Sequence, residues 1–335
     1  MSMFDELDPK EFEDTARAVI ETCAAATDTA ARATLLAEAG LVGIIAPEAV
    51  GGLGLPIRFA VPIVSAAGAG LLAYPLIESI LLARHLAPVA PTIASAIAAG
   101  ESVASIAWNG CAEDGVVGGA PLGLDAAQVL VFLAGGGAAL VRPGAGADIQ
   151  PGAGLDVDAP DSSFTLTGAA PTALLDAEAV AALRADAALL RAGFVMGSAA
   201  QCLALAAEYA QERVQFGKPL SAYQVLRHRL SRDALAVESL RTGLTRALAE
   251  PAEGAAMARE AVWLAAALIG PNVAESAIQV FGGMGFTWEV PLHRHLRQMH
   301  AQTTYGAATA GLDALAADLL TDTNNEWYGD LANAG

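Results

Sequence analysis

Arg213-Val-Gln-Phe-Gly-Lys-Pro219 is followed later in the chain by Gln279-Val-Phe-Gly-Gly-Met-Gly285, and these two stretches say most about the fold. Each reads as a helix end that runs into a glycine turn, because glycine suits a left-handed helix cap and proline blocks continuation. Each also carries a polar side chain, Arg213 or Gln279, with no obvious role in a core. The two stretches therefore predict long helices whose ends have a role beyond packing.

Helical patterns surround these two ends. We expect one helix over about 177–215 and a second that begins with Ser221 as its N-cap. A third helix is expected over 255–281 and a last one over about 304–320. Four helices in this order predict a four-helix bundle over residues 173–335.

The rest of the chain divides into two zones. Residues 1–103 read as helices joined by short turns and predict an N-terminal helical domain. Over 104–172 glycine and proline become dense, and short runs at 131–133 and 164–167 look like strands between turns. The sequence thus predicts a mainly α fold with a small central β domain over 104–172.

Composition excludes several function classes. A hydrophobic content of 54% and a charged content of 16% exclude general disorder. The net charge of −18 argues against nucleic-acid binding, because no basic stripe is present to neutralise phosphates. The most apolar stretch, 60–100, is interrupted by charges and prolines, so we expect no membrane insertion. The three cysteines have no ligand spacing and predict reduced thiols in the cytoplasm. The histidines form no pattern that predicts a metal site.

The two stretches, in this order, resemble the flavin-contacting segments of the acyl-CoA dehydrogenase family. A turn at Pro47-Glu-Ala-Val-Gly-Gly-Leu-Gly54 is similar to the family's N-terminal signature. The resemblance implies the family's fold, with its middle β domain shortened here, and FAD as the cofactor. It also implies that these segments reach the FAD of a neighbouring subunit.

Carried over residue by residue, the resemblance places Arg213 against the FAD pyrophosphate, where a planar guanidinium pairs with two phosphate oxygens. It places glycines where the backbone must come close to the cofactor. The cofactor-binding residues implied in this way are Arg213, Gln215, Phe216, Leu220, Tyr223, Gln224, Gln279, Val280, Gly282 and Gly283.

The residues that would perform the family's chemistry are missing from their usual positions. The reaction is an α,β-dehydrogenation of an acyl thioester, which requires a carboxylate base. Gly306 occupies the usual position of the catalytic glutamate, and Ala308 and Ala310 stand where a threonine and a glutamine hold the subunit's own flavin. We therefore expect no catalytic residue in this chain.

Two alternatives stay open. A minority of the family carries its base on the earlier bundle helix, where Ala187 stands here. Asp186, one residue away, is turned by about 100° around the helix. The chain is then a homo-oligomeric acyl-CoA dehydrogenase with a displaced carboxylate base, Asp186 or Glu178. The other alternative is a flavin-free scaffold with the same fold.

Taken together, the resemblance implies the short, non-catalytic subunit of a heterotetrameric (α2β2) acyl-CoA dehydrogenase of the kind that degrades steroid side chains in bacteria. A full-length catalytic partner would supply the glutamate base and hold most of the acyl-CoA, with a steroid side-chain acyl-CoA as one substrate class. An electron-transfer flavoprotein would accept the electrons.

Overall fold

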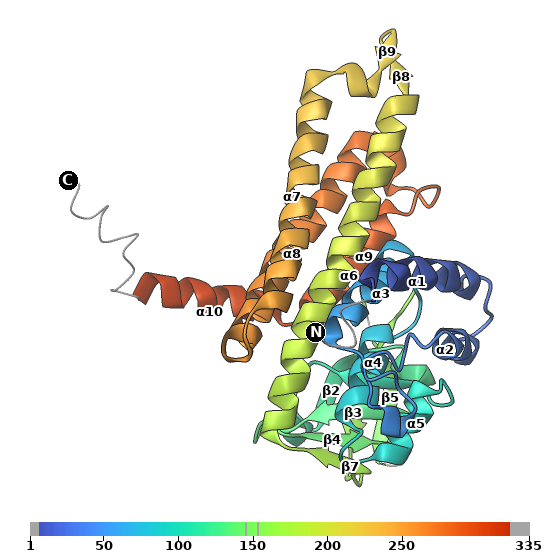
Figure 1. The fold of residues 1–335 in the computed structure, drawn as a ribbon, viewed down its shortest axis with the longest axis vertical. Coiled ribbons are helices and arrows are strands. Elements are labelled where there is room, and N and C mark those ends of the chain that lie inside the picture. Colours follow the sequence, from blue (N-terminus) through green and yellow to red (C-terminus); the bar gives the residue numbers. More distant parts are fainter. Residues whose placement is uncertain (1–6, 145, 153, 322–335) are drawn as a thin grey trace.

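A computed structural model of the chain describes residues 7–144, 146–152 and 154–321 (Figure 1). Its N-terminal part is helical. Asp8 and Asp28 start the first two helices, because their side chains accept hydrogen bonds from the backbone N–H groups of Lys10 (2.9 Å) and Ala31 (2.8 Å). The helices of this part are α1 (Pro9–Cys23), α2 (Thr29–Glu38), α3 (Ala60–Ala69), α4 (Leu76–His85) and α5 (Pro91–Ala98).

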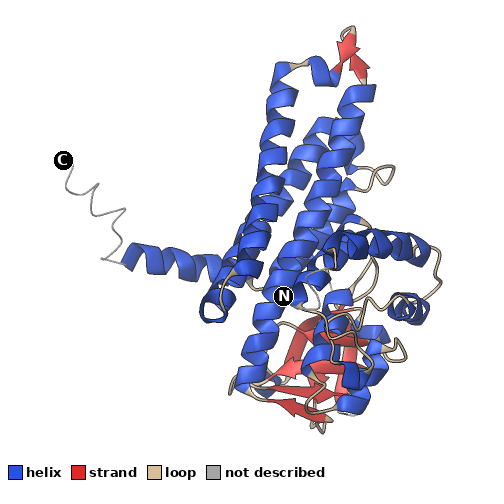
Figure 2. Cartoon of the chain, in the orientation of Figure 1, coloured by secondary structure: helices blue, strands red, loops and turns tan. Residues whose placement is uncertain are grey.

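Two small sheets follow and lie at one end of the long helices (Figure 2). In the first sheet β1 (Ala104–Ala107) pairs in parallel with β3 (Gln128–Phe132), and β4 (Ala138–Val141) and β7 (Ala173–Leu175) continue it in antiparallel order. The second sheet is antiparallel, in the order β2 (Val116–Pro121), β6 (Asp161–Leu166) and β5 (Ala147–Pro151). The two runs that predicted strands fall on β3 and β6.

The C-terminal part is built around α6 (Ala177–Glu212), which Asp176 caps and which is buried along much of its length. A hairpin of β8 (Val214–Gln215) and β9 (Lys218–Pro219) joins it to α7 (Gln224–Ala249). Then come α8 (Ala252–Phe281), α9 (Leu292–Tyr305) and α10 (Ala308–Thr321). Gly197 lets α3 approach α6, because a Cβ there would overlap the backbone of Ser65.

Two predicted helix boundaries are wrong. Ser221 is not an N-cap: it lies in a 3₁₀ turn, and α7 begins only at Gln224 because Tyr223 is extended (φ −87°, ψ 124°). The expected last helix begins at Ala308 and not near Thr304, because Ala307 has a positive φ of 48° and separates α10 from α9, which ends at Tyr305. After this break α10 extends away from the bundle (Figure 1).

The predicted fold class is confirmed: a mainly α chain with a small central β part and a C-terminal bundle. The boundaries of the three predicted domains stay predictions. Residues 1–6 of the first domain and 322–335 of the last lie outside the described residues. By length and composition alone, α6 and residues 254–286 pass the test for a membrane-spanning helix. However, 72% and 67% of their most apolar windows are buried inside this chain, as in the core helices of a globular protein.

Candidate functional site

The hairpin at the far end of the bundle has an unusual turn. Its strands pair Gln215 with Lys218 and close on Phe216 and Gly217, whose φ angles are +52° and +82°. Two positive φ values at the centre of a two-residue loop define a type I′ turn, which favours asparagine or glycine. Phe216 is instead 95% exposed in a left-handed conformation. A large apolar side chain held in this way marks a contact surface.

The hairpin is braced from within. The hydroxyl of Tyr223 donates to the carbonyl of Gln215 (2.9 Å), and the backbone N–H of Leu220 donates to the carbonyl of Arg213 (2.8 Å). The ammonium of Lys218 lies 4.2 Å from the centre of the Tyr223 ring. The guanidinium of Arg213 is exposed and forms no hydrogen bond or ion pair with the described residues. The backbone is therefore ordered while this cation stays available.

The end of α8 lies beside the end of α6. Phe281 stacks on Tyr209 with ring centres 4.1 Å apart and planes 12° apart. This contact stands two residues after Gln279, which is exposed, and four residues before Arg213. Gly282 has φ +64° and ψ −139°, a conformation that favours glycine, and a Cβ on Gly283 would meet no atom within 4 Å. The backbone here is open to a close approach from outside.

The structure brings the ten predicted cofactor-binding residues to this one end, which we call the hairpin end. Tyr223 acts as a brace, and the side chain of Val280 is buried and so is not available to a ligand. The exposed members are Arg213, Gln215, Phe216, Gln224, Gln279 and Gly283, and the half-buried ones are Leu220, Tyr223 and Gly282. A guanidinium, three exposed carboxamides and open glycine backbone fit the phosphates and sugars of a dinucleotide.

Gly306 lies in a different region, at a cavity of about 460 Å³ between α6, α8 and the start of α10. We call it the Gly306 cavity. The indole N–H of Trp263 donates to the Gly306 carbonyl (3.2 Å), and a Cβ on Gly306 would overlap the indole ring. The space that a side chain at this position needs is therefore filled by Trp263.

A buried charged group lines the same cavity. The guanidinium of Arg191 lies 3.8 Å from the centre of the Trp108 ring, and Trp108 donates its N–H to the carboxyl of Glu78 (2.8 Å). Burial lowers the pKa of Arg191 to about 10 and raises the pKa of Glu78, while each group's charge favours the ionised form of the other. Nε and Nη2 of Arg191 have no hydrogen-bond partner among the described residues.

The carboxylates proposed as displaced bases lie outside this cavity. Asp186 is buried and surrounded by His85 (3.0 Å), Arg259 (2.5 Å) and Arg84 (3.6 Å). Glu178 is exposed in the first turn of α6. The carboxylate that does line the cavity is Glu260, which the motif comparison missed. The sequence signal that could have identified Glu260 is its position three residues before Trp263, because residues three apart share a helix face.

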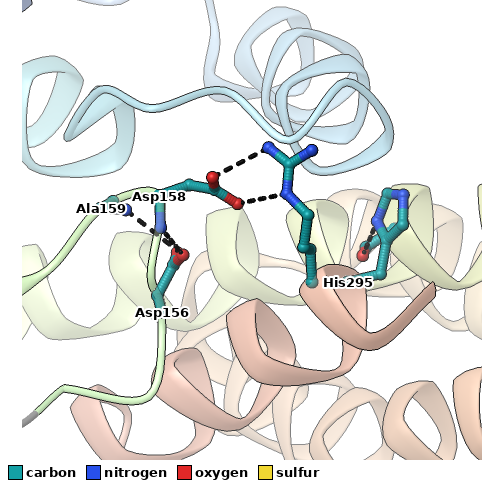
Figure 3. Close-up of polar contacts among 6 residues, drawn as sticks. Asp156, Asp158, Ala159 and His295 are labelled. Atoms are coloured by element: carbon teal, nitrogen blue, oxygen red, sulfur yellow. Dashed lines mark hydrogen bonds and ion pairs between the residues drawn. The ribbon is translucent and has the colours of Figure 1, made fainter. Parts of the chain in front are cut away.

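A clasp joins the β part to α9 close to this region (Figure 3). Arg294 donates two hydrogen bonds to the carboxylate of Asp158, at 2.8 and 2.9 Å. Asp156 fixes the same loop by accepting from the backbone N–H groups of Asp158 (2.9 Å) and Ala159 (3.3 Å). A bidentate pair of this geometry holds the loop in one orientation.

Behind Tyr305 a second cavity of only about 20 Å³ is lined by Glu78, Asp156, Gln298 and Gln302 among others. This volume holds about one water molecule. Carboxyl and carboxamide groups around so small a space leave no room for an acyl chain.

His295 is the residue after Arg294 on α9. Its Nδ1 is 2.8 Å from the hydroxyl of Ser198 (Figure 3), and its ring also hydrogen-bonds the backbone of Gly68. Burial, with a further contribution from the charge of Arg294, lowers the pKa of His295 to about 4. The imidazole is therefore neutral at pH 7 and serves to join α6, α3 and α9.

Comparison with known proteins identifies a domain in the C-terminal part of the chain. Residues 182–312 match the C-terminal domain of acyl-CoA dehydrogenases. The acyl-CoA dehydrogenase FadE27 of Mycobacterium tuberculosis is 28% identical over 326 residues, which are 85% of this chain and 86% of FadE27. Two curated relatives with 36% and 35% identity align over only 35% and 36% of their own length.

Solved structures share the fold. One chain in the crystal structure of the ChsE4–ChsE5 complex from Mycobacterium tuberculosis has a TM-score of 0.84 at 23% identity and covers 96% of this chain and 99% of its own. A variant of the Tcur3481–Tcur3483 steroid ACAD has a TM-score of 0.82 at 23% identity, over 93% and 97%. Residues 182–312 thus carry the C-terminal domain of acyl-CoA dehydrogenases, and the whole chain has the fold of these solved structures.

Proposed function

We propose that this chain is a subunit of an FAD-dependent acyl-CoA dehydrogenase complex and completes the FAD site of a catalytic partner. One observation carries the proposal: the hairpin end gathers exposed polar groups that fit a dinucleotide, whereas Trp263 fills the space at Gly306. The groups that would serve a neighbour's cofactor are present, and those that would serve the chain's own reaction are replaced.

Each group of the hairpin end has a defined role in this proposal. When bound, FAD supplies the acceptor for the hydride that leaves the acyl chain. Arg213 pairs its planar guanidinium fork with two pyrophosphate oxygens. Gln279 offers a carboxamide to the adenosine, and the backbone N–H groups at Gly282 and Gly283 approach the phosphates without a side chain in the way.

The partner chain holds the glutamate base and most of the acyl-CoA. The similar structures of the ChsE4–ChsE5 complex and of Tcur3481–Tcur3483 support an assembly of two different chains. Because Tcur3481–Tcur3483 is a steroid acyl-CoA dehydrogenase (ACAD), it also supports a steroid side-chain acyl-CoA as the substrate. Electrons leave to an electron-transfer flavoprotein, and the complex works in the cytoplasm. If the complex oxidised only straight-chain acyl-CoAs, the steroid part of the proposal would be wrong.

An outward face of α8 supports the assembly. Its exposed residues follow steps of three, four and seven and so lie on one side of the helix. The face is apolar near its start and polar towards the hairpin end. Its residues are Met257, Ala261, Leu268, Asn272, Glu275 and Gln279. Exposed apolar side chains that lead to a cofactor site suit a helix of the partner.

The test is to purify the chain alone and with a full-length acyl-CoA dehydrogenase as partner, and to measure FAD per chain. We expect a colourless lone chain and one FAD per heterodimer. Arg213→Gln should lower FAD content in the complex at least tenfold at limiting FAD, because it removes a charge-assisted pair. Arg241→Gln, which changes an arginine paired with Glu238 on the same bundle, is the matched control.

The position of Glu260 favours a second candidate, a homo-oligomeric dehydrogenase with its own base on α8. In that case the lone chain would be yellow and its flavin would bleach on addition of an acyl-CoA. Glu260→Gln would abolish the bleaching while the yellow colour remained. A lone chain and a complex that both stayed colourless in excess FAD would instead indicate a scaffold.

A further inference from the structure

The Gly306 cavity is separate from the hairpin end. Arg191 and Arg213 stand on the same helix, and 22 residues at 1.5 Å per residue place them about 33 Å apart. The cavity is also larger than a packing defect: about 460 Å³ lies within the range of small-molecule sites. Its function is therefore a question of its own, which the proposed FAD contacts do not answer.

The floor of the cavity carries an incompletely satisfied cation. Arg191 is only 3% exposed, and two of its three guanidinium nitrogens, Nε and Nη2, lack a hydrogen-bond partner in the described part of the chain. Glu78 is near enough to interact by charge, but its carboxyl group accepts a hydrogen bond from Trp108. Buried polar groups in folded proteins are almost always paired, so an unpaired guanidinium beside a cavity points to a missing acceptor.

The walls define the shape and chemistry of that acceptor. Trp108 and Trp263 contribute flat aromatic surfaces, and alanines of α6 contribute a smooth apolar side. Arg184 adds a second guanidinium to the lining and itself stacks on Phe132, 3.9 Å from the ring centre. Among the side chains that the structure describes, the one carboxylate in the lining is that of the exposed Glu260 on α8. An anion on the α6 side and an apolar body between the indoles match this arrangement.

We propose that the Gly306 cavity is a binding site for an organic carboxylate with a flat apolar body, whose carboxylate pairs with Arg191 and Arg184. The planar fork of a guanidinium suits both oxygens of a carboxylate. The apolar body packs against Trp108 and Trp263 and excludes water from the ion pair. No bond of the ligand changes, so the site binds and does not catalyse.

The ligand site can be tested with 2-naphthoate and, as its neutral counterpart, 2-naphthalenemethanol. Trp108 and Trp263 line the cavity, so binding is read from quenching of tryptophan fluorescence in the full chain, with calorimetry for stoichiometry. We expect one 2-naphthoate per chain and at least tenfold weaker binding of the alcohol. Equal affinity for the acid and the alcohol, or several weak sites per chain, would overturn the proposal.

Substitutions in and beside the cavity test whether the ligand binds there. Arg191→Gln should weaken 2-naphthoate at least tenfold, and Glu78 can take up a proton once the guanidinium is gone because its pKa is raised. Because that variant disturbs a buried charge, Ala185→Phe provides a second test: it fills the cavity from the half-buried lining of α6. Ala182→Phe, exposed on the same helix and outside the lining, is the control and should bind like the natural chain. Binding that survived Ala185→Phe would refute the site.

The result of the 2-naphthoate binding test does not depend on the FAD proposal. Ala185→Phe should leave FAD per complex unchanged, because the cavity lies about 33 Å from the hairpin end. If FAD displaced 2-naphthoate from the lone chain, the cavity would be a flavin site and the carboxylate proposal would be wrong. If 2-naphthoate bound as expected in a complex without flavin, the FAD proposal alone would fail.

Discussion

At the scale of single residues, Gly306 is the most informative position. Gly306 stands where the resemblance implies a glutamate, and Trp263 occupies the space that a side chain there needs and hydrogen-bonds the Gly306 carbonyl. A single reversion is therefore not enough to restore a base. A carboxylate at position 306 also requires that the indole of Trp263 be displaced.

This interpretation predicts that Gly306→Glu destabilises the chain by about 1–3 kcal/mol, the usual cost of overpacking a filled site. It should also fail to create dehydrogenase activity in the lone chain. Combining it with Trp263→Ala removes the overlap, so the double variant should be more stable than the sum of the two single changes predicts. Chemical denaturation of the four proteins measures this coupling. Strict additivity would show that the indole moves aside without cost.

His295 gives a prediction about pH. Its pKa is about 4 in the folded chain and 6.5 in the unfolded chain, so the unfolded chain binds the proton more strongly. The stability contributed by neutral His295 is present above pH 6.5 and is lost as the pH falls from 6.5 to about 4. The loss amounts to about 3 kcal/mol as an order of magnitude. Denaturant unfolding of the natural chain and of His295→Gln at pH 4.5 and 7 tests this.

The comparison with the variant is needed because Glu78 and Asp156 act in the opposite direction. Burial raises the pKa of each, so their contributions favour the folded chain at low pH. Subtracting the two pH profiles removes these shared contributions. A difference that stays constant between pH 4.5 and 7 would contradict the lowered pKa of His295.

At the scale of elements, the hairpin of β8 and β9 combines a rigid brace with an unfavourable turn residue. A left-handed, exposed phenylalanine costs stability in the lone chain, and nothing within the described residues compensates for it. The compensation is therefore expected in the complex, where the ring is covered by the partner or its cofactor.

Phe216→Asn should accordingly separate stability from function. Asparagine tolerates the left-handed conformation, so the lone chain should unfold at the same temperature or a few degrees higher. In the complex, FAD should dissociate faster, because the apolar contact of the ring is lost. Thermal unfolding and the rate of flavin release measure the two effects. Leu124→Asn, which changes another exposed apolar residue in the β part, serves as control, and an equal effect on flavin release would contradict a specific role of Phe216.

The elements also show what the sequence can and cannot reveal. Helix ends at Arg213 and Gln279 were predictable because glycine and proline act locally on the backbone. The break at Ala307 was not, since a left-handed alanine has no local signal and depends on the packing around Gly306. The hydrogen bond from Tyr223 to the hairpin and the packing of Trp263 against Gly306 depend on how separate segments are oriented in the fold. Periodicity alone does not contain them.

The same distinction between local signals and contacts made by the fold applies to the candidate site. Residue types at the hairpin end were predictable by resemblance, and the structure adds that Tyr209 and Phe281 hold the two segments together. The Gly306 cavity was not predictable, because Arg191, Trp108 and Glu78 come from three elements and no spacing in the sequence links them. Burial of an arginine is visible only once the fold is known.

At the scale of the whole molecule, a 335-residue chain with net charge −18 leaves apolar surface exposed on its bundle. Leu268 is 51% exposed and Met257 is 77% exposed on the same face of α8, and α10 projects from the bundle with Leu315 exposed (Figure 1). Self-repulsion between acidic chains disfavours random association, so this surface suits a specific partner.

Leu268→Asp tests that role of the α8 face. A carboxylate placed in an apolar interface must be desolvated without a partner, so we expect the heteromeric complex to dissociate at concentrations where the natural complex is intact. The lone chain should keep its unfolding temperature, because Leu268 is already exposed to water in it. Leu174→Asp, equally exposed on β7 and away from the bundle, is the matched control. Sedimentation velocity of both mixtures decides: a complex that survives Leu268→Asp as well as Leu174→Asp would mean that the partner binds another face.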